Sequence, residues 1–374
     1  MGLTSPMGGP RVLDQSEVVR YLIDRSLLAP HAVVDGTVVV RDASSRNRIF
    51  IVDSGDTSSF VLKQGTSPEG VAAVAHEAAV YESLGQRRDR ISNYLPTMWE
   101  YDKAGQVLIL GKVHGDRDLR AHQVRIGRFS RALAISLGDA LGALHQKTAQ
   151  NVPQTLQCPT PWVLSVHRPN LSIFRNASSA ALELIRIVQS APEFGDRLED
   201  LRGGWEPSCL IHHDVKWDNL IACPTDSRRR ATFRLKIIDW EAAQLGDPRW
   251  DMGSVFCQYL SLWLFSIPIT GRDPPERFPD LANFPLGRMQ PAMADCWSAY
   301  RKRADLDLPG ATAWLLAAVS YAGARLVQTA FEAAQAATHL DSSMVLHLQL
   351  ASNILVRPRE AAAHLLGITM GPGR

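Results

Sequence analysis

The chain has 374 residues, of which 45% are hydrophobic and 21% are charged, and its formal net charge is +2 at pH 7. This composition supports a sizeable core and excludes wholesale disorder, and the small net charge gives no reason to expect a nucleic-acid partner or a charged membrane surface. Five scattered cysteines without a Cys-x-x-Cys pair favour buried thiols in a reducing compartment over a disulfide framework or a zinc site.

No targeting segment is expected. The first residues lack the basic and apolar regions of a signal peptide. The most apolar run, residues 259–270, is shorter than the roughly 20 residues that span a bilayer, so it predicts a buried helix. We therefore expect a cytoplasmic protein without a membrane partner.

The first 113 residues alternate β-rich runs with helical patterns. Apolar residues recur at 3- and 4-residue steps in residues 69–84, and residues 15–28 are amphipathic, so both predict helices. Residues 33–40 predict a hairpin with Asp35-Gly36 at its tip. Strands are expected at residues 49–52, 60–63, 98–101 and 107–110.

After residue 114 the pattern becomes mainly helical. Helices are predicted at residues 129–146, 178–189, 314–337 and 342–354. The two Pro-rich stretches, 158–169 and 268–291, predict long irregular connections. The whole pattern predicts an α+β fold in which a small β-rich lobe, residues 1–113, precedes a large and mainly helical lobe, residues 114–374.

One segment of the second lobe carries a chemical signature. Residues 211–221 read Ile-His-His-Asp-Val-Lys-Trp-Asp-Asn-Leu-Ile, and residues 236–240 read Lys-Ile-Ile-Asp-Trp. Phosphoryl transfer needs a carboxylate that orients a hydroxyl and oxygen ligands that hold Mg²⁺. His-x-Asp-x₄-Asn arises often by chance and Asp ends many strands, but the two together, in this order on a strand-loop-strand frame, favour a catalytic site.

These motifs resemble those of the aminoglycoside phosphotransferase and choline-kinase-like family, which is related to the protein kinases. The resemblance runs from about residue 38 to residue 259 and is strongest at residues 211–254. It implies a bilobal, protein-kinase-like fold. It also implies that Asp214 accepts the proton of the attacking hydroxyl, that Asn219 and Asp239 hold Mg²⁺, and that His212 braces the loop. Gly246-Asp247-Pro248-x-x-Asp251 matches a further family motif, whose last Asp anchors the catalytic loop.

Two residues of the first lobe fit the same interpretation. Lys63 ends a predicted strand, and Glu77 lies on the following helix. A kinase needs a Lys that grips the α- and β-phosphates of ATP, or of another nucleoside triphosphate, and a Glu that positions the Lys. The alternative is a surface Lys and a solvated helix Glu. By the same resemblance, Leu110 faces the back of the adenine pocket, and the Gly111 carbonyl and Val113 amide bond to adenine.

Two departures mark the chain as an unusual member. The loop that would cover the phosphates, residues 42–48, has no glycine, so Ser45 and Asn47 would offer the polar donors and Arg46 or Arg48 would reach a phosphate. This leaves room for a different nucleotide preference or a weak ATPase. Lys216 stands two residues after Asp214, where it can neutralise charge on the moving phosphoryl group. The alternative for Lys216 is a salt-bridged loop residue.

The acceptor is less well marked. A polycationic aminoglycoside would need an acidic binding surface. After Pro309 only Glu332, Asp341 and Glu360 are acidic, which argues against such a substrate. Choline binding would need a cage of aromatic side chains, which the Trp residues could form, but nothing in the sequence places them together. The insert at residues 150–204, together with Lys216, is similar to the phosphotransferase subunits of ribosomal-peptide pathways, which implies a Ser or Thr of a precursor peptide as acceptor and a partner lyase. A small-molecule kinase is the alternative. A pseudokinase scaffold, which the glycine-free loop favours and the intact site residues oppose, is a third interpretation.

Overall fold

The structure is a computed structural model that describes residues 12–55, 59–85, 90–115, 118–149, 159–224, 233–269, 274–306 and 308–369. The chain forms two compact units. The first comprises Met1–Asp116 and Lys236–Ala243, and the second comprises Arg117–Leu235 and Gln244–Arg374. Asp239 therefore belongs to the first unit, although the sequence analysis assigned it to the second lobe.

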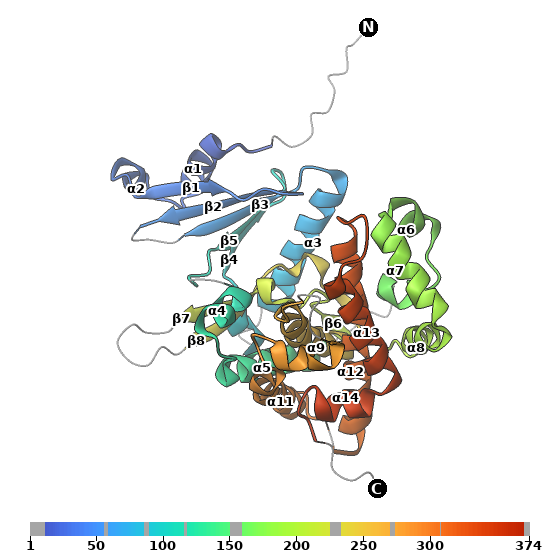
Figure 1. Cartoon of the computed structure of the whole chain (residues 1–374). Coiled ribbons are helices and arrows are strands. Elements are labelled where there is room, and N and C mark those ends of the chain that lie inside the picture. The colour runs from blue at the N-terminus through green and yellow to red at the C-terminus, as the bar shows by residue number, and fades with distance from the viewer. Residues whose placement is uncertain are drawn as a thin grey trace. The chain divides into compact units, whose positions relative to one another are not determined.

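The first unit contains a five-stranded antiparallel sheet with the strand order β1-β2-β3-β5-β4 (Figure 1). The strands predicted from β-rich composition are confirmed, and the bounds are β1 Val38–Asp42, β2 Arg48–Ser54, β3 Phe60–Gln64, β4 Met98–Asp102 and β5 Val107–Gly111. In the described residues before β5, the helical segments are α1 Gln15–Asp24, α2 Pro30–Val34, α3 Pro68–Gly85 and the 3₁₀ turn η1 Arg90–Tyr94.

The alternation of side chains along the strands divides the sheet into two faces. One face packs with α1 and α2 in a core that includes Val18, Leu22, Phe50 and Leu62. Lys63 follows Leu62, so its side chain leaves the opposite face, where α3 packs on β3, β4 and β5. Strand periodicity thus places the Lys63 ammonium on the same side of the sheet as α3.

The hairpin predicted at residues 33–40 is wrong. Residues Pro30–Val34 form helix α2, with Pro30 at the first helical position, and only the second half of the predicted hairpin is strand β1. Gly36 has φ +68°, the left-handed conformation that commonly ends a helix. Pro30 and Gly36 here start and end a helix. The prediction instead interpreted Asp35-Gly36 as the turn of a hairpin.

The second unit is mainly helical. The helix predictions that start near residues 129, 178 and 342 are confirmed, and the helix expected at 314–337 starts earlier, at Leu308. The bounds are α4 Leu119–Ile126, α5 Arg131–Ala149, η2 Trp162–Ser165, α6 Leu171–Asn176, α7 Ser179–Ser190, α8 Pro192–Gly203, η3 Trp217–Asn219, α9 Pro248–Phe265, η5 Pro275–Arg277, α10 Phe278–Leu281, α11 Leu286–Arg303, α12 Leu308–Ala334, α13 Ser342–Val356 and α14 Pro358–His364.

The prediction of an irregular connection over residues 268–291 is partly wrong, because α11 begins inside it and contains Pro291. This helix buries Met289, Met293, Trp297 and other residues at 3- and 4-residue spacing. The burial of that apolar face outweighs the one backbone hydrogen bond that an internal Pro removes. Proline content alone therefore misled the prediction.

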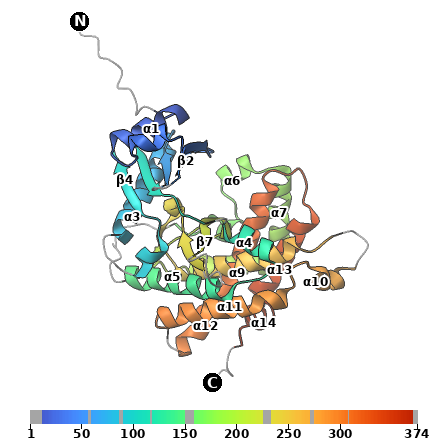
Figure 2. The same ribbon diagram turned by 90° about the vertical axis from the view of Figure 1, so that its left-hand side faces the viewer.

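Helix α9 forms the centre of the second unit, and every residue from Trp250 to Leu264 is buried. Helix α12 packs on α9 and α13, and α11 packs along α5 (Figure 2). The close approach of α5 and α11 depends on Gly138, since a Cβ there would lie 2.1 Å from the Cys296 carbonyl oxygen. Within the described residues, Gly310–Ala334 is long and apolar enough to cross a membrane, but 61% of its apolar 18-residue window is buried, as in a core helix.

Short strands frame the chemical motif. Strand β6, Cys209–Ile211, pairs antiparallel with β9, Gln244–Gly246, and β7, Leu220–Pro224, neighbours β8, Phe233–Ile237. The 3₁₀ turn η4, Trp240–Ala242, lies between β8 and β9. Among the described residues, Cys209, Cys257 and Cys296 are buried, Cys223 is half-buried, and Cys158 lies outside the described residues.

Candidate active site

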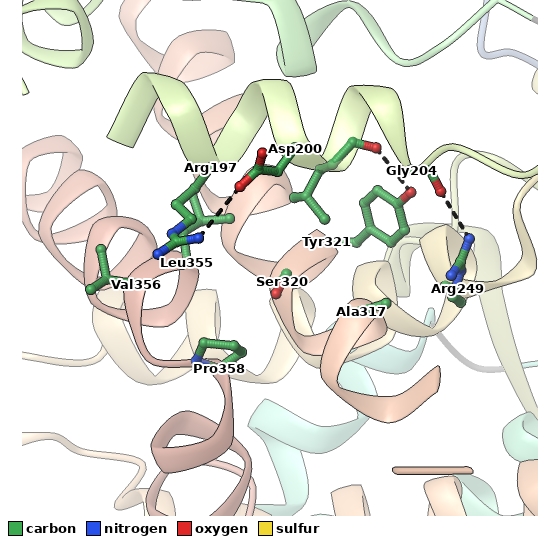
Figure 3. Close-up of a pocket in the computed structure, with 11 residues that line it drawn as sticks. Arg197, Asp200, Gly204, Arg249, Ala317, Ser320, Tyr321, Leu355, Val356 and Pro358 are labelled. Atoms are coloured by element: carbon green, nitrogen blue, oxygen red, sulfur yellow. Dashed lines mark hydrogen bonds and ion pairs between the residues drawn. The ribbon is translucent and has the colours of Figure 1, made fainter. Parts of the chain in front are cut away.

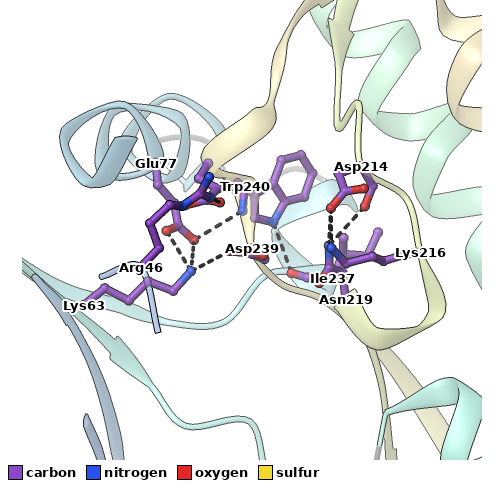
Figure 4. Close-up of polar contacts among 10 residues, drawn as sticks. Arg46, Lys63, Glu77, Asp214, Lys216, Asn219, Ile237, Asp239 and Trp240 are labelled. Carbon is purple, nitrogen blue, oxygen red and sulfur yellow. Dashed lines mark hydrogen bonds and ion pairs between the residues drawn. The ribbon is translucent and has the colours of Figure 1, made fainter. Parts of the chain in front are cut away.

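The side chain of Lys63 joins two carboxylates in the first unit. Its ammonium lies 2.9 and 2.8 Å from the two oxygens of Glu77 and 2.8 Å from Oδ1 of Asp239 (Figure 4). Glu77 is 1% exposed and Lys63 is 14% exposed, so this is a largely desolvated salt bridge, in which loss of one partner leaves an unpaired buried charge. The structure thus brings together three residues that the sequence predicted for one site.

Burial and pairing act in opposite directions on the pKa values in this cluster. Burial lowers the pKa of Lys63, but the charges of Glu77 and Asp239 outweigh it and raise that pKa above its ordinary value. Burial raises the pKa of Glu77, and the Lys63 ammonium offsets this only in part. One ammonium between two carboxylates leaves an excess of negative charge, which favours a further cation.

The backbone around Asp239 is held in a fixed conformation. Asp239 has φ +65°, in the left-handed region that Asp tolerates better than most residues. The next amide, from the fully buried Trp240, donates to Oε1 of Glu77 at 3.2 Å, and the Trp240 indole donates to the Ile237 carbonyl at 3.1 Å. Glu77 therefore positions both the Lys63 ammonium and the chain that carries Asp239.

The glycine-free loop between β1 and β2 is closed by its own polar groups. The Ser44 hydroxyl accepts the Ile49 amide at 3.0 Å, and the Ser45 amide donates to the Asn47 carbonyl at 3.1 Å. The Arg46 guanidinium pairs with Glu241 at 2.7 Å. Asn47 is buried, and its Oδ1 accepts no hydrogen bond within the described residues. Phosphate binding by Ser45 and Asn47 remains a prediction.

The end of β5 is the predicted adenine-binding segment. Leu110 is buried in the sheet. The Gly111 amide donates to the Thr97 carbonyl at 2.7 Å, so this amide is already used, and the Val113 carbonyl accepts the Gly115 amide at 3.0 Å. The contacts of Leu110, Gly111 and Val113 with adenine remain predictions.

In the second unit, Asp251 holds the loop that carries Asp214. Its fully buried carboxylate accepts the backbone N–H groups of His212 and His213 at 2.8 and 2.9 Å, and it lies 3.2 Å from Nε2 of His145. His213 has φ +68°, and its carbonyl accepts the Trp250 indole N–H at 3.0 Å. Asp251 thus anchors this loop, as the family motif implied, and the buried His212 contributes its backbone amide.

Asp214 lies between two cations of its own unit. Its Oδ2 accepts from the Lys216 ammonium at 2.7 Å and from the Asn219 amide at 3.3 Å (Figure 4). Its Oδ1 lies 3.6 Å from Nη2 of Arg325. Burial alone would raise the pKa of Asp214, but the Lys216 hydrogen bond and the charges of Lys216 and Arg325 lower it below its usual value. The carboxylate is therefore ionised at neutral pH.

Comparison with known proteins identifies the family. The model described as the phosphotransferase enzyme family matches residues 37–275, which is more than half of the chain. The chain belongs to this family. The fold is similar to that of a choline kinase from Cryptosporidium parvum Iowa II, with 11% identity over 93% of this chain and 96% of that chain and a TM-score of 0.52.

A proposed fructosamine-3-kinase from Thermobifida fusca YX-ER1 is also similar to this phosphotransferase, with 18% identity, 86% of this chain and 93% of that chain covered, and a TM-score of 0.50. At such low identities these likenesses establish a kinase-like fold. Comparison with curated proteins gave no match. The expected family and the expected α+β, kinase-like fold are thus confirmed, and the chain is a kinase-type enzyme by family.

Arg325 is the site residue of this phosphotransferase that the sequence analysis missed. It lies on α12, outside the matched residues 37–275, and its guanidinium carbon lies 5.3 Å from the centre of the Trp250 ring. A signal was present, because Arg325 is the only charged residue between Pro309 and Phe331. A lone charge in an apolar helix usually requires a partner, but the sequence did not show which partner.

Each unit of this phosphotransferase carries an oxygen donor of the kind that suits a hard cation. Asn219 donates its amide N–H groups to Asp214, which turns the amide oxygen away from that bond, and Oδ2 of Asp239 accepts no hydrogen bond within the described residues. Carboxylate and amide oxygens suit Mg²⁺, which takes few protein ligands and completes its shell with phosphate and water. Among the described residues, no group of three or more His, Cys, Asp and Glu side chains is placed to hold a metal ion.

A separate pocket of about 380 Å³ opens in the second unit among α8, α12 and α13 (Figure 3). It contains none of the predicted site residues. Tyr321 and Arg249 line it, and both bond to Asp247, the residue that caps α9 at its N-terminus. The pocket therefore abuts the structure that supports Asp251, while the chemistry-bearing side chains lie elsewhere.

Proposed function

We propose that this enzyme transfers the γ-phosphoryl group of ATP, or of another nucleoside triphosphate, to a substrate hydroxyl. The observation that carries the proposal is the Lys63 ammonium bound by two carboxylates, Glu77 and Asp239, within 3 Å. A surface Lys has no need of two carboxylates, one of them buried, whereas a Lys that grips phosphates has to be held in one orientation.

The reaction forms one bond and breaks one bond. The acceptor oxygen attacks the γ-phosphorus, the bond from that phosphorus to the β–γ bridging oxygen breaks, and the products are a phosphate ester and a nucleoside diphosphate. Asp214 orients the hydroxyl through Oδ1 and receives its proton, because Oδ2 is already bonded to Lys216 and Asn219. A carboxylate with a lowered pKa is a weak base, so its main contribution is orientation of the hydroxyl.

The cations of the second unit limit the charge that develops during transfer. The Lys216 ammonium lies 2.7 Å from Oδ2 of Asp214, so it can offset the change in charge as the proton moves to Asp214 and the phosphoryl group is transferred. Asn219 of the second unit and Asp239 of the first unit each carry an oxygen of the kind that Mg²⁺ prefers, and this ion when bound would neutralise charge on the phosphate oxygens.

Nucleotide-dependent thermal stabilisation tests this function. We expect ATP with Mg²⁺ to raise the melting temperature of the full chain, and Asp239→Asn to abolish most of that rise. Asp196→Asn, which changes an exposed carboxylate of α8, is the matched control. No rise in wild-type protein with ATP, GTP, CTP or UTP would refute the proposal. Transfer itself is measured by ³¹P NMR of an added phosphate ester, which Asp214→Asn should eliminate.

The acceptor expected from the sequence was a Ser or Thr in a ribosomally made precursor peptide, with a partner lyase, and a small hydroxyl compound was the alternative. The insert that suggested a peptide folds, in its described part, into η2, α6, α7 and α8. Leu171 and Phe174 are exposed on α6, which is an apolar surface that a peptide could use. The peptide acceptor, the lyase partner and a cytoplasmic location remain predictions.

A pseudokinase is the second candidate function. Arg46, a predicted phosphate ligand, is paired with Glu241, and the predicted phosphate ligand Asn47 is buried. A pseudokinase would give nucleotide-dependent stabilisation without phosphate-ester formation, so the two measurements above separate it from an enzyme.

A further inference from the structure

Arg325 is a buried cation whose donors are unused. Its side chain is 8% exposed and makes no hydrogen bond within the described residues, and its Nε is buried without a partner. Its one ion-pair contact, Nη2 to Oδ1 of Asp214, is 3.6 Å long, beyond hydrogen-bond distance. A guanidinium has five N–H donors, and burying them unsatisfied is costly. The side chain is therefore set up for a partner that arrives with the substrate.

The place of Arg325 identifies which part of the substrate it meets. Oδ1 of Asp214 is the oxygen left for the acceptor hydroxyl, because Oδ2 is bonded to Lys216 and Asn219. Arg325 lies beside that same Oδ1. A group bound by Arg325 must then lie within a few bonds of the hydroxyl that Asp214 orients.

Charge selects the chemistry of that group. Asp214 carries one negative charge, and Lys216 and Arg325 carry two positive charges beside it. Burial lowers the pKa of the neighbouring His213 to about 4, so that imidazole is neutral at pH 7 and leaves the balance unchanged. The buried carboxylate of Asp251 is already engaged by the His212 and His213 amides and by His145. Among the side chains that contact Asp214 itself, positive charge is therefore in excess, which attracts an anion and repels a cationic alcohol. A planar guanidinium binds a carboxylate through two parallel hydrogen bonds.

We propose that the acceptor is a small hydroxy acid, whose carboxylate binds Arg325 while its hydroxyl lies at Asp214. The proposal rests on the proposed phosphotransferase function and names its substrate class. A Ser or Thr inside a peptide presents neutral amides at the same distance from its hydroxyl, so Arg325 favours the small-molecule alternative over the peptide. Arg325 is thus the specificity-determining residue of the acceptor site.

The test compares hydroxy acids with their primary amides. The probes are glycolate, lactate, glycerate, 3-hydroxybutyrate and N-acetylserine, each beside its amide, with ATP, Mg²⁺ and the full chain. We expect kcat/KM for the best acid to exceed that for its amide by about 100-fold, the discrimination that a charge-assisted hydrogen-bond pair supplies. In Arg325→Gln this ratio should fall to within about threefold of one, whereas the exposed Arg288→Gln should keep it.

Two outcomes would overturn the proposal. One is a wild-type ratio of kcat/KM, acid over amide, near one. If N-acetylserinamide were the best acceptor, the result would favour a peptide substrate instead. The other is a ratio that Arg325→Gln leaves unchanged, which would assign Arg325 to the phosphoryl group or to Asp214 alone.

A second measurement uses the wild-type protein, so it remains informative if the Arg325 variant fails to fold. It also tests the carboxylate site independently of the proposed function. The same acids and amides are titrated into the wild-type protein without nucleotide, and thermal stabilisation is recorded. Stabilisation by an acid and not by its amide supports the carboxylate site even if no phosphate ester forms, and its absence counts against the site even if ATP binds. Arg325→Lys keeps the positive charge but loses the planar guanidinium that can donate two parallel hydrogen bonds, so this variant should lose most of the stabilisation.

Discussion

The buried carboxylate of Asp251 accepts the backbone N–H of His213 at 2.9 Å and so fixes the turn that places Asp214. Its other oxygen accepts the His212 N–H at 2.8 Å. Burial would raise the pKa of Asp251, but the hydrogen bond with His145, the neighbouring imidazoles of His145 and His212, and the bond from the His212 amide lower it. The placement of Asp214, the proposed base, thus depends on a residue that need not touch the substrate.

Asp251→Asn should therefore impair both stability and turnover. An amide keeps the volume but directs an NH₂ group at a backbone donor, which leaves that donor buried and unsatisfied. We expect the free energy of unfolding to fall by about 2–3 kcal/mol in urea titrations, and kcat to fall more than KM rises. Unchanged kcat in a folded variant would show that Asp251 does not position the loop.

Lys63→Met should weaken nucleotide binding. Loss of the ammonium leaves Glu77 and Asp239 without their shared cation, and burial would then raise the pKa of Glu77 further. We expect the Kd for ATP to rise by at least about tenfold in calorimetric titrations, the effect of one lost charge-assisted contact. Lys103→Met, at an exposed turn between β4 and β5, is the control. Equal affinity in the two variants would contradict the role of Lys63.

His213 should make the protein less stable in mild acid. Burial lowers its pKa to about 4, whereas the unfolded chain binds the proton near the ordinary value of about 6.5. Between these values the unfolded state binds more protons, so stability falls as pH falls, by about 2 kcal/mol from pH 7 to pH 5.

His213→Asn tests this pH dependence. Asn also tolerates the φ of +68° found at this position. The variant should lose about 2 kcal/mol less than the wild type between pH 7 and pH 5 in urea titrations. Parallel curves for the two proteins would show that His213 is not the group responsible.

Lys216→Met should move the acidic limb of the pH profile. The Lys216 hydrogen bond and charge lower the pKa of Asp214, so their removal raises it, and the base becomes protonated at a higher pH. The acidic limb of kcat/KM should shift upward by about one pH unit. A profile that falls in rate without shifting would assign Lys216 to the phosphoryl group alone.

Gly138→Ala should destabilise the second unit. A Cβ at Gly138 would lie 2.1 Å from the Cys296 carbonyl, so α5 and α11 would have to separate. We expect a loss of about 2–3 kcal/mol in the free energy of unfolding. Gly287→Ala in α11 meets nothing within 4 Å and should be neutral or stabilising by up to about 1 kcal/mol. Equal effects at the two positions would show that the helices adjust freely.

Part of this site could be predicted from the sequence, because several of its residues belong to one short motif. His212, Asp214 and Asn219 lie within one loop, and the sequence separations of such a motif are set by the local backbone. The strands that carry Lys63 and Leu110 were visible because each is a short run of β-branched and large apolar residues. The buried stripe of α11 outweighed Pro291, because burial of an apolar face can override a local preference. Helix α2 replaced a predicted hairpin because Pro30 and Gly36 start and end a helix there.

The sequence alone determined the reaction-bearing residue types, their order and the family, because these depend on local motifs. Only the tertiary structure showed that one Lys63 ammonium bridges Glu77 and Asp239, across 176 residues in the second case. Only the structure placed Arg325 of α12 beside Asp214. Long-range ion pairs follow from the packing of helices and strands around a core, and the sequence encodes that packing through the whole chain rather than through a motif.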